Sequence, residues 1–312
     1  CGAVLCLGVL ACQSSSDGAP AAPSSPSSAA VDSLVPLPDS LLVPPDSTRA
    51  RFDSVMQGAQ SADLHTLPIG RIMQWVGMQF QGAPYLVGTL DEPAEETLVV
   101  RLDGFDCVTF VETAWAMARG IQEQDYAYAS FARRLAQQRY RSGTLGYCQR
   151  LHYFTDWIDA NERRGLLTNR TGDLGGRVLQ DTIDFMSTHR SAYDRFAAND
   201  SLYRCVQRME DTLRARHRAE PIRYVPQDSI RAVYDQLQAG DVIALATSID
   251  GLDVSHTGLA YAHDDGSIGL LHASTSGGVV VSPDLQRYVQ QIGHQIGIVV
   301  ARPHAGRPHA GR

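Results

Sequence analysis

The sequence predicts an α+β protein, with a helical N-terminal half packed on an antiparallel β-sheet formed by the C-terminal half. Two observations lead to this class. Apolar residues recur at helical spacing in several segments between residues 47 and 216, whereas short apolar runs separated by turn residues fill residues 241–302. Consecutive strands joined by short turns pair antiparallel, and the helices are expected to cover the sheet as one layer.

The helical segments come first along the chain. Helical spacing covers residues 47–60 and 68–81, and Gly82-Ala83-Pro84 breaks the second helix. Residues 97–102 are strand-like. The next helix starts near residue 107 and is expected to end at Gly120. Its apolar stripe consists of Val108, Val111, Ala114, Trp115 and Ala118. Further helices are expected over residues 128–139, 152–163, 179–188 and 192–216.

The strands follow. A short strand near 222–225 and a helix at 228–237 lead into the sheet. Its strands are expected over residues 241–247, 254–262, 267–273, 278–282 and 295–302, with a helix near 283–291. The chain closes on the tandem repeat RPHAGRPHAGR. Its histidines are candidate metal ligands, but we interpret residues 304–312 as a disordered tail.

Composition excludes several classes of protein. The chain has 312 residues, which suits one large or two small domains. A net charge of −7 disfavours a broad nucleic-acid footprint. All 27 basic residues are arginine, so a P-loop, a lysine Schiff base and a Ser–Lys dyad are excluded. No apolar run reaches the roughly 18–20 residues that a spanning helix needs.

The N-terminus is interpreted as a targeting segment. Residues 1–12 resemble the apolar core of a signal peptide, and Val9-Leu10-Ala11-Cys12 resembles the lipobox of bacterial lipoproteins, in which the cysteine is lipidated. Residues 13–46 hold seven Pro and many Ser and Ala, which predicts a disordered tether before a folded domain over 47–303. Gln13 in place of Asp favours the periplasmic side of the outer membrane. The alternative for residues 1–12 is a short buried strand or helix.

Three cysteines remain outside this leader, in which Cys1, Cys6 and Cys12 lie. Three is an odd number, so at least one of Cys107, Cys148 and Cys205 is free or paired between molecules. Cys148 and Cys205 are expected to be buried or to form a disulfide. Because no CxxC occurs, a zinc ribbon and a thioredoxin-type site are excluded.

Cys107 is the candidate nucleophile. It begins a predicted helix, where the helix dipole and free N–H groups stabilise a thiolate and are expected to lower its pKa. The same N–H groups can hold an oxyanion. Asp106 is a suitable N-cap for this helix. A thiolate still needs a base and a group that orients the base.

Two histidines on neighbouring strands fit these roles. Asp264-Asp265-Gly266 suits a three-residue hairpin loop whose glycine is left-handed. In that register Gly258 faces His272. His256 and His272 then share one face as diagonal neighbours about 7–8 Å apart, and Gly258 leaves the path between them open. A slip of one residue would place them on opposite faces.

The segments around these residues resemble a known family. FDCVTFVE, SHTGLAY and LLHAS are similar to the NlpC-type papain-like cell-wall cysteine peptidases. The segments RLHYFTDWIDANE and GAPYLVGTLD resemble their N-acetylmuramoyl-L-alanine amidase-like branch. The resemblance covers roughly residues 65–303 and implies a papain-like fold. Val108-Thr109 stands where the wider superfamily has Ser-Gly after the cysteine, a departure that fits the amidase-like branch.

The resemblance also implies an activity and a set of site residues. Cys107 would be the nucleophile, His256 the base and His272 the orienting group. Tyr85 would approach the cysteine, and Asp106 would contact substrate. The implied reaction is hydrolysis of the amide between N-acetylmuramic acid and L-alanine in peptidoglycan fragments, in cell-wall turnover or recycling, without cofactor or metal.

Alternatives stay open at this point. A γ-D-glutamyl-diamino acid endopeptidase of the same superfamily and an inactive, tethered wall-binding protein are the rival functions. Arg150 and His152 either recognise an anionic muropeptide or tie their loop to the helix at 152–163, and Ser255 is a further candidate for substrate binding. A zinc site of His256, His263, Asp264 and His272 is disfavoured, because His263 and Asp264 lie at the hairpin turn.

Overall fold

The computed structural model describes residues 37–93, 95–179 and 182–304. The predicted leader with Cys12, most of the predicted tether and residues 305–312 lie outside the described residues. Within the described ranges, no helix is both long and apolar enough to cross a membrane.

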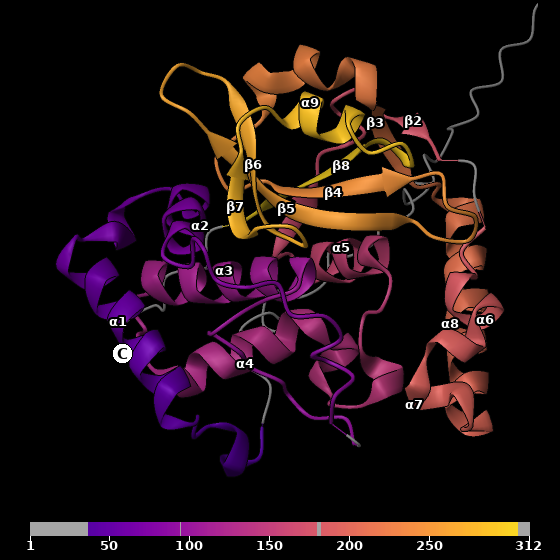
Figure 1. Ribbon diagram of the computed structural model, residues 1–312, viewed down its shortest axis with the longest axis horizontal. Helices are drawn as coiled ribbons and strands as arrows, with labels where there is room; N and C mark the ends of the chain where they lie inside the picture. The colour runs from indigo at the N-terminus through magenta and orange to yellow at the C-terminus, as the bar shows by residue number, and fades with distance from the viewer. Residues whose placement is uncertain (1–36, 94, 180–181, 305–312) are drawn as a thin grey trace, which may run out of the picture. The chain divides into compact units, whose positions relative to one another are not determined.

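Helices cover both faces of a central antiparallel sheet (Figure 1). On one face lie α1 (Asp46–Ser61), α2 (Ile69–Met78), α3 (Cys107–Gln122), α4 (Tyr128–Arg139) and α5 (Phe154–Arg163). On the other face lie η7 (Gln227–Gln236), a 3-10 helix, and α9 (Leu285–Gln290). A separate group of helices flanks the sheet: α6 (Phe185–Thr188), α7 (Asp194–Ala197) and α8 (Asp200–Ala219). Short 3-10 turns join these elements: η2 (Asp39–Leu41), η3 (Leu64–Thr66), η4 (Arg141–Gly143), η5 (Tyr147–Gln149) and η6 (Arg190–Ala192).

The sheet has the order β2-β3-β8-β4-β5-β6-β7, with β1 also paired to β8, and all of these pairings are antiparallel. The α+β class is therefore confirmed. The strands are β1 (Leu167–Asn169), β2 (Arg177–Val178), β3 (Arg223–Pro226), β4 (Val242–Thr247), β5 (Val254–Ala262), β6 (Ile268–Ser274), β7 (Gly278–Ser282) and β8 (Gln295–Pro303).

The expectation of a single helical layer is wrong. Neighbouring residues of β6 point to opposite faces, as the pleat requires. Leu270 packs in the cluster that contains Ile230 of η7 and Leu285 of α9. Leu271 points the other way, so close to α2 that a Cβ on Gly77 would lie 2.7 Å from it. Since both faces of β6 are apolar, both need a helical cover.

The predicted hairpin between β5 and β6 is confirmed. The ladder pairs Leu259 with Leu271 and continues to Ala262 with Ile268. At the turn, the His263 N–H donates to the Ser267 carbonyl at 3.0 Å, and Gly266 has a φ of +83°. The loop length and the left-handed glycine thus set the register that the sequence predicted.

Several predicted elements differ from the structure. Residues 97–102 form no strand. Two of their carbonyls accept hydrogen bonds from side chains instead: Arg139 Nη1 donates to Val99 O at 2.7 Å, and Tyr140 Oη donates to Thr97 O at 3.0 Å. Helix α3 runs past Gly120, where the missing side chain makes room for the Asp125 carbonyl, 2.8 Å from the position of a Cβ.

Two predicted helices are shorter or broken. Residues 179–188 yield only α6, and residues 192–216 divide into α7 and α8. The break comes where the Asn199 side chain accepts from Ser201 N and Leu202 N and so starts a new helix. The predicted helix at 228–237 is the 3-10 helix η7.

The folded region extends slightly beyond the predicted domain ends. Residues 39–41, assigned to the tether from composition, form η2, and Leu37 is buried. His304, assigned to the tail, hydrogen-bonds the Thr168 hydroxyl at 2.6 Å. A few apolar and hydrogen-bonding contacts suffice to order these residues.

Candidate active site

Cys107 is the first residue of α3, and the cap that precedes it fixes its position. The Asp106 Oδ1 atom accepts from Thr109 N at 2.7 Å, and the Asp106 N–H donates to Thr109 Oγ1 at 3.0 Å. This reciprocal pair is a capping box with threonine at its third position. Asp106 is thus the N-cap that the sequence predicted, and its carboxylate lies beside the thiol.

The loop that carries Tyr85 is held between α3 and the edge strand β7. Gly82 N–H donates to Val279 O, and Val279 N–H donates to Ala83 O, both at 2.8 Å. Gly278 must be glycine here, because its φ is +68° and a Cβ would lie 2.2 Å from the Ala83 carbonyl oxygen. Tyr85 itself bridges to Phe105, two residues before Cys107.

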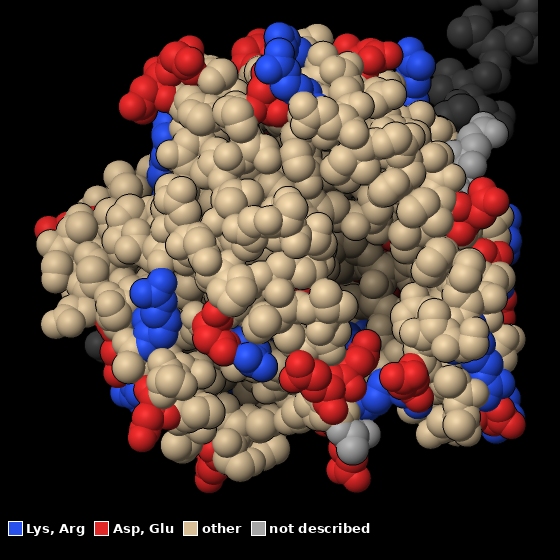
Figure 2. Space-filling model, viewed as in Figure 1, with Lys and Arg blue, Asp and Glu red and all other residues tan. Residues whose placement is uncertain are grey.

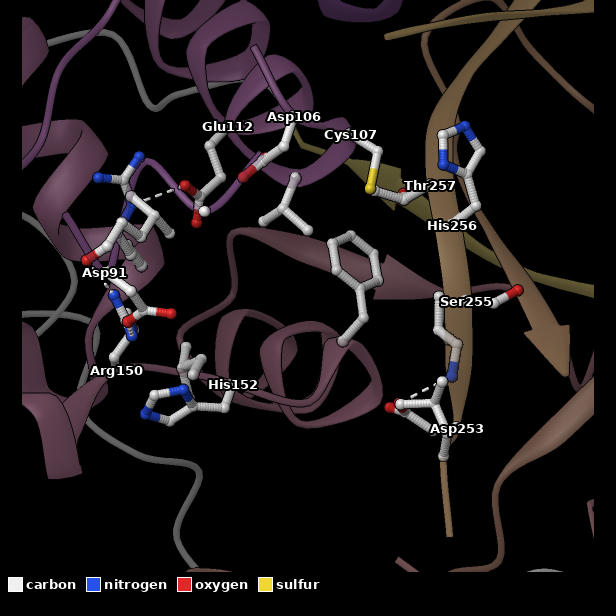
Figure 3. A pocket seen from close by; sticks show the side chains of 18 residues that line it. Asp91, Asp106, Cys107, Glu112, Arg150, His152, Asp253, Ser255, His256 and Thr257 are labelled. Carbon is white, nitrogen blue, oxygen red and sulfur yellow. Dashed lines mark hydrogen bonds and ion pairs between the residues drawn. The ribbon is translucent and has the colours of Figure 1, made fainter. Parts of the chain in front are cut away.

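Three donors meet the sulfur of Cys107. The β5–β6 ladder begins at Leu259, so Thr257 lies before it, and its backbone N–H donates to the sulfur. The Tyr85 hydroxyl and the Val108 N–H are the other two. Figure 3 shows the sulfur next to Thr257, between the start of α3 and the His256 segment of β5.

The predicted lowering of the thiol pKa is wrong. Burial, and then the negative charge of Asp106, raise the pKa of Cys107 to about 12, although the donors from Thr257, Tyr85 and Val108 oppose the shift. Desolvation of the sulfur and the charge of the cap outweigh the helix dipole on which the prediction rests. The neutral thiol of Cys107 is therefore favoured over the thiolate.

His256 and His272 lie in a hydrogen-bonded row. His256 Nε2 is 2.7 Å from His272 Nδ1, and His272 Nε2 is 3.1 Å from Ser282 Oγ. A Cβ on Gly258 would lie 2.8 Å from the Cβ of His272, so glycine is needed for this approach. The ring of Tyr288, from α9, packs edge-on against His272 at 4.7 Å. His256 and His272 thus share one face, as the register predicts.

Burial keeps both imidazoles neutral. It lowers the pKa of His256 to about 4 and the pKa of His272 to about 3, and the neighbouring His256 adds to the shift at His272. A neutral His256 that donates from Nε2 to His272 leaves Nδ1 unprotonated. His272 Nε2 then carries the hydrogen and donates a hydrogen bond to the Ser282 hydroxyl oxygen. Sequence analysis missed Ser282, because its role depends on the β6–β7 pairing.

A cavity of about 310 Å³ opens beside the sulfur. On the face shown in Figure 2, charged side chains lie mainly around the edge, and the hollowed centre is largely uncharged. Inside the cavity, Cys107, Asp106 and His256 form one wall (Figure 3). Arg150 and His152 lie at the opposite wall with Asp91.

Arg150 has internal partners. Its Nη1 donates to Leu90 O at 2.8 Å, and its Nη2 pairs with Asp91, while Glu96 lies 3.6 Å from Nη1. The guanidinium also stacks over the Tyr147 ring at 4.8 Å. Only about 5% of Arg150 is exposed. Its charge is therefore balanced by two carboxylates. This favours the predicted role of holding the loop in place over the predicted role of binding an anionic muropeptide.

Ser255 contributes to the cavity mainly through its backbone. Ser255 is the extra residue of a β-bulge, since Leu245 pairs with His256 and Ala246 with Val254, and its hydroxyl points away from the cavity in Figure 3. Its Oγ is buried without a hydrogen-bond partner. The predicted contact of this hydroxyl with substrate is not visible in this arrangement.

Cys148 and Cys205 form a disulfide, and Cys107 is free. The disulfide joins η5 to α8. It thereby ties the loop with Arg150 and His152 to the flanking helices. His263 packs against Tyr261 at the hairpin end, with 4.8 Å between ring centroids, and does not line the cavity.

Comparison with known proteins identifies the family of this chain. Residues 75–298 match the AmiA-like family, described as N-acetylmuramoyl-L-alanine amidase-like, and this is more than half of the chain. The protein therefore belongs to this amidase-like family of hydrolases. No curated protein matches the chain.

Solved structures support this assignment. An N-acetylmuramoyl-L-alanine amidase from Bacteroides uniformis has a TM-score of 0.69 and 32% identity, over 76% of this chain and 99% of its own. A Bacteroides fragilis protein, named as a candidate xylanase, has a TM-score of 0.66 and 36% identity, over 72% and 98%. The Legionella pneumophila protein LPG0564 shares the fold at a TM-score of 0.60 and 21% identity, over 82% and 95%.

The raised pKa of Cys107 predicts slow alkylation at neutral pH. Because only the thiolate reacts, the rate of inactivation by iodoacetamide should rise about tenfold per pH unit from pH 6 to 9. Asp106→Asn keeps a good N-cap but removes the neighbouring charge, so it should react faster than wild type at pH 7. A wild-type rate that is level between pH 6 and 8 would show a preformed thiolate instead.

Proposed function

We propose that this protein is a cysteine amidase that hydrolyses the amide between N-acetylmuramic acid and L-alanine in peptidoglycan fragments. The main support is that Cys107, at a helix N-terminus, and His256, which is hydrogen-bonded to His272, line the same cavity. Family membership supports an amidase-type hydrolase, and the Bacteroides uniformis protein of similar structure is named for this bond. The organisation fits an NlpC-type papain-like enzyme.

The first half of the reaction forms an acyl-enzyme. His256 Nδ1 takes the thiol proton as the sulfur attacks the amide carbonyl, because both groups are neutral before substrate binds. The N–H of Cys107 has no carbonyl partner within α3 and donates to the Tyr85 hydroxyl oxygen, a place that the oxyanion would take in the proposed reaction. The carbon–nitrogen bond then breaks, and His256 returns its proton to the leaving amine.

The second half releases the acid. His256, neutral again, takes a proton from water as the water oxygen attacks the thioester carbon. The carbon–sulfur bond breaks, and the proton passes to the sulfur, which restores the thiol. His272 holds the His256 ring in place and shares the positive charge that His256 carries in each transition state.

The candidate-xylanase name of one structural neighbour does not lead to a second proposal. A glycosidase needs two carboxyl groups available as acid and base. The four carboxyl groups of the described cavity lining are engaged by protein donors. Glu112 is bound by Arg139 and Trp157, and Asp253 by Thr155 and Val254. Asp91 pairs with Arg150, and Asp106 accepts from the Thr109 N–H in the helix cap.

The decisive experiment is mass spectrometry of the products from one defined muropeptide. We expect free L-alanyl stem peptide and an intact N-acetylmuramic acid. Cys107→Ala should leave less than one part in a hundred of the wild-type rate, since the sulfur forms the intermediate. Cleavage between D-glutamate and the diamino acid would identify the rival endopeptidase. Tight binding without any product would favour the wall-binding alternative.

Ser282 should matter because its hydroxyl is hydrogen-bonded to His272 Nε2, and in the proposed tautomer it accepts that bond. Ser282→Val should lower kcat/KM about three- to tenfold, the equivalent of one neutral hydrogen bond, whereas the nearly isosteric Ser282→Thr should retain most activity. Ser276→Ala, in the turn before β7, is the matched control and should not change the rate. The histidine tautomers can be read from ¹⁵N chemical shifts. If the shifts of His256 and His272 are the same in Ser282→Val as in wild type, the role assigned to Ser282 is incorrect.

We also propose that the protein is exported and anchored by a lipid on Cys12, on the periplasmic side of the outer membrane. The Cys148–Cys205 disulfide supports export, because such bonds persist in oxidising compartments. A palmitate analogue should label the full-length precursor, and Cys12→Ala should abolish the label. An unlabelled precursor that remains in the soluble fraction would refute the anchor.

A further inference from the structure

The hydrogen bond of His152 fixes which of its ring nitrogens can face substrate. His152 Nε2 is 2.8 Å from the Tyr147 carbonyl oxygen. A carbonyl oxygen only accepts, so Nε2 carries the hydrogen. In Figure 3 the other ring nitrogen points from the His152 wall into the cavity, and His152 is among the residues that line it. A neutral His152 therefore presents an unprotonated Nδ1 to a ligand.

The surroundings of His152 keep it neutral. Burial lowers its pKa to about 3, and the positive charge of Arg150 shifts it in the same direction. Arg141 and Arg195 add smaller effects of the same sign, while the bond to Tyr147 O opposes them. At every pH at which the protein is expected to work, His152 accepts hydrogen bonds through Nδ1.

The charged groups at this wall point to the same kind of ligand. The two guanidinium groups of the cavity are already ion-paired, Arg150 with Asp91 and Arg139 with Glu112. Asp91 is partly exposed, with 43% of its side chain accessible. Because both guanidinium groups of the described cavity lining are already paired with carboxylates, the lining offers no free positive charge to an additional carboxylate. A hydroxyl or an amide N–H would find two acceptors, Asp91 and His152 Nδ1.

We infer that the wall formed by Asp91 and His152 binds a neutral hydrogen-bond donor, and that this donor is a hydroxyl or acetamido N–H of the sugar half of the substrate. The inference rests on the proposed function, in which a sugar lies on one side of the scissile amide and an anionic peptide on the other. It replaces the sequence-based expectation that Arg150 and His152 recognise an anionic group. The anionic peptide is then left to the part of the site away from this wall.

Binding to the Cys107→Ala protein tests this, because neither ligand is then consumed. The sugar half is N-acetylmuramic acid amide, which is neutral, and the peptide half is L-Ala-D-Glu. Two variants are compared, His152→Asn and His152→Leu. Both variants lose the hydrogen bond from Nε2 to Tyr147 O, but asparagine keeps an acceptor near the position of Nδ1. A difference between them therefore reports the cavity-facing acceptor rather than the lost structural bond.

We expect calorimetry to show the sugar amide bound about three- to tenfold more weakly by His152→Leu than by His152→Asn, the effect of one neutral hydrogen bond. The affinity for L-Ala-D-Glu should be equal in the two variants. Sugar binding to the Cys107→Ala parent should not change between pH 5 and 8, because His152 stays neutral.

The opposite results would overturn the inference. If the two variants differ only in their affinity for L-Ala-D-Glu, this wall binds the anionic peptide. If neither ligand distinguishes them, His152 Nδ1 makes no contact. Product analysis with the wild-type protein is independent of both results. If the muramoyl–alanine bond is cleaved but the two variants bind the sugar amide equally, only this inference is wrong. If the variants bind the sugar amide unequally but the bond is not cleaved, only the proposed reaction is wrong.

Discussion

The β5–β6 ladder ends at Leu259 and Leu271, and the catalytic geometry depends on this early end. Beyond it, the Thr257 N–H donates to the Cys107 sulfur, and His256 meets His272 at 2.7 Å. Continued pairing would have directed the Thr257 N–H into the ladder. Gly258 completes the arrangement, since a side chain there would collide with His272. One hairpin thus supplies the donor to the sulfur, the candidate base and the group that orients it.

Desolvation dominates the electrostatics of the site. It raises the pKa of the thiol and lowers the pKa of both imidazoles, so that a thiolate–imidazolium pair is disfavoured. In the proposed reaction the charged pair forms only as the substrate carbonyl takes up the electron density of the sulfur. Hydrogen bonds from Thr257, Tyr85 and Val108 already point at the place where this charge develops. The site is organised for a transient charge rather than for a stored one.

The edge strand β7 connects parts of the site that are distant in sequence. Through Gly278 and Val279 it holds the loop that carries Tyr85. Through Ser282 it supports His272 from behind. A disturbance of this one strand would therefore affect the candidate nucleophile and the candidate base together. On the other side of the cavity, the Cys148–Cys205 disulfide and the ion pairs of Arg150 hold the wall that contains His152.

Local sequence determined the helix start at Cys107, the cap at Asp106 and the hairpin register that aligns His256 with His272. Each of these follows from a few adjacent residues, because a cap, a three-residue turn and the pleat of a strand are short-range constraints. The class of fold followed in the same way from the order of helical and strand-like segments. The second helical cover over the sheet did not, since it depends on the packing of η7 and α9 against the second apolar face of the sheet.

The tertiary structure alone decided the charge state of Cys107, the partners of Arg150 and the contact of Ser282 with His272. These properties depend on groups far apart in the chain. Burial of the sulfur requires α3 to lie against β5, Arg150 meets Asp91 and Glu96 from a separate segment, and Ser282 reaches His272 only across β7 and β6. Desolvation and long-range pairing are set by packing, and short sequence patterns carry no information about which distant side chains will close over a site.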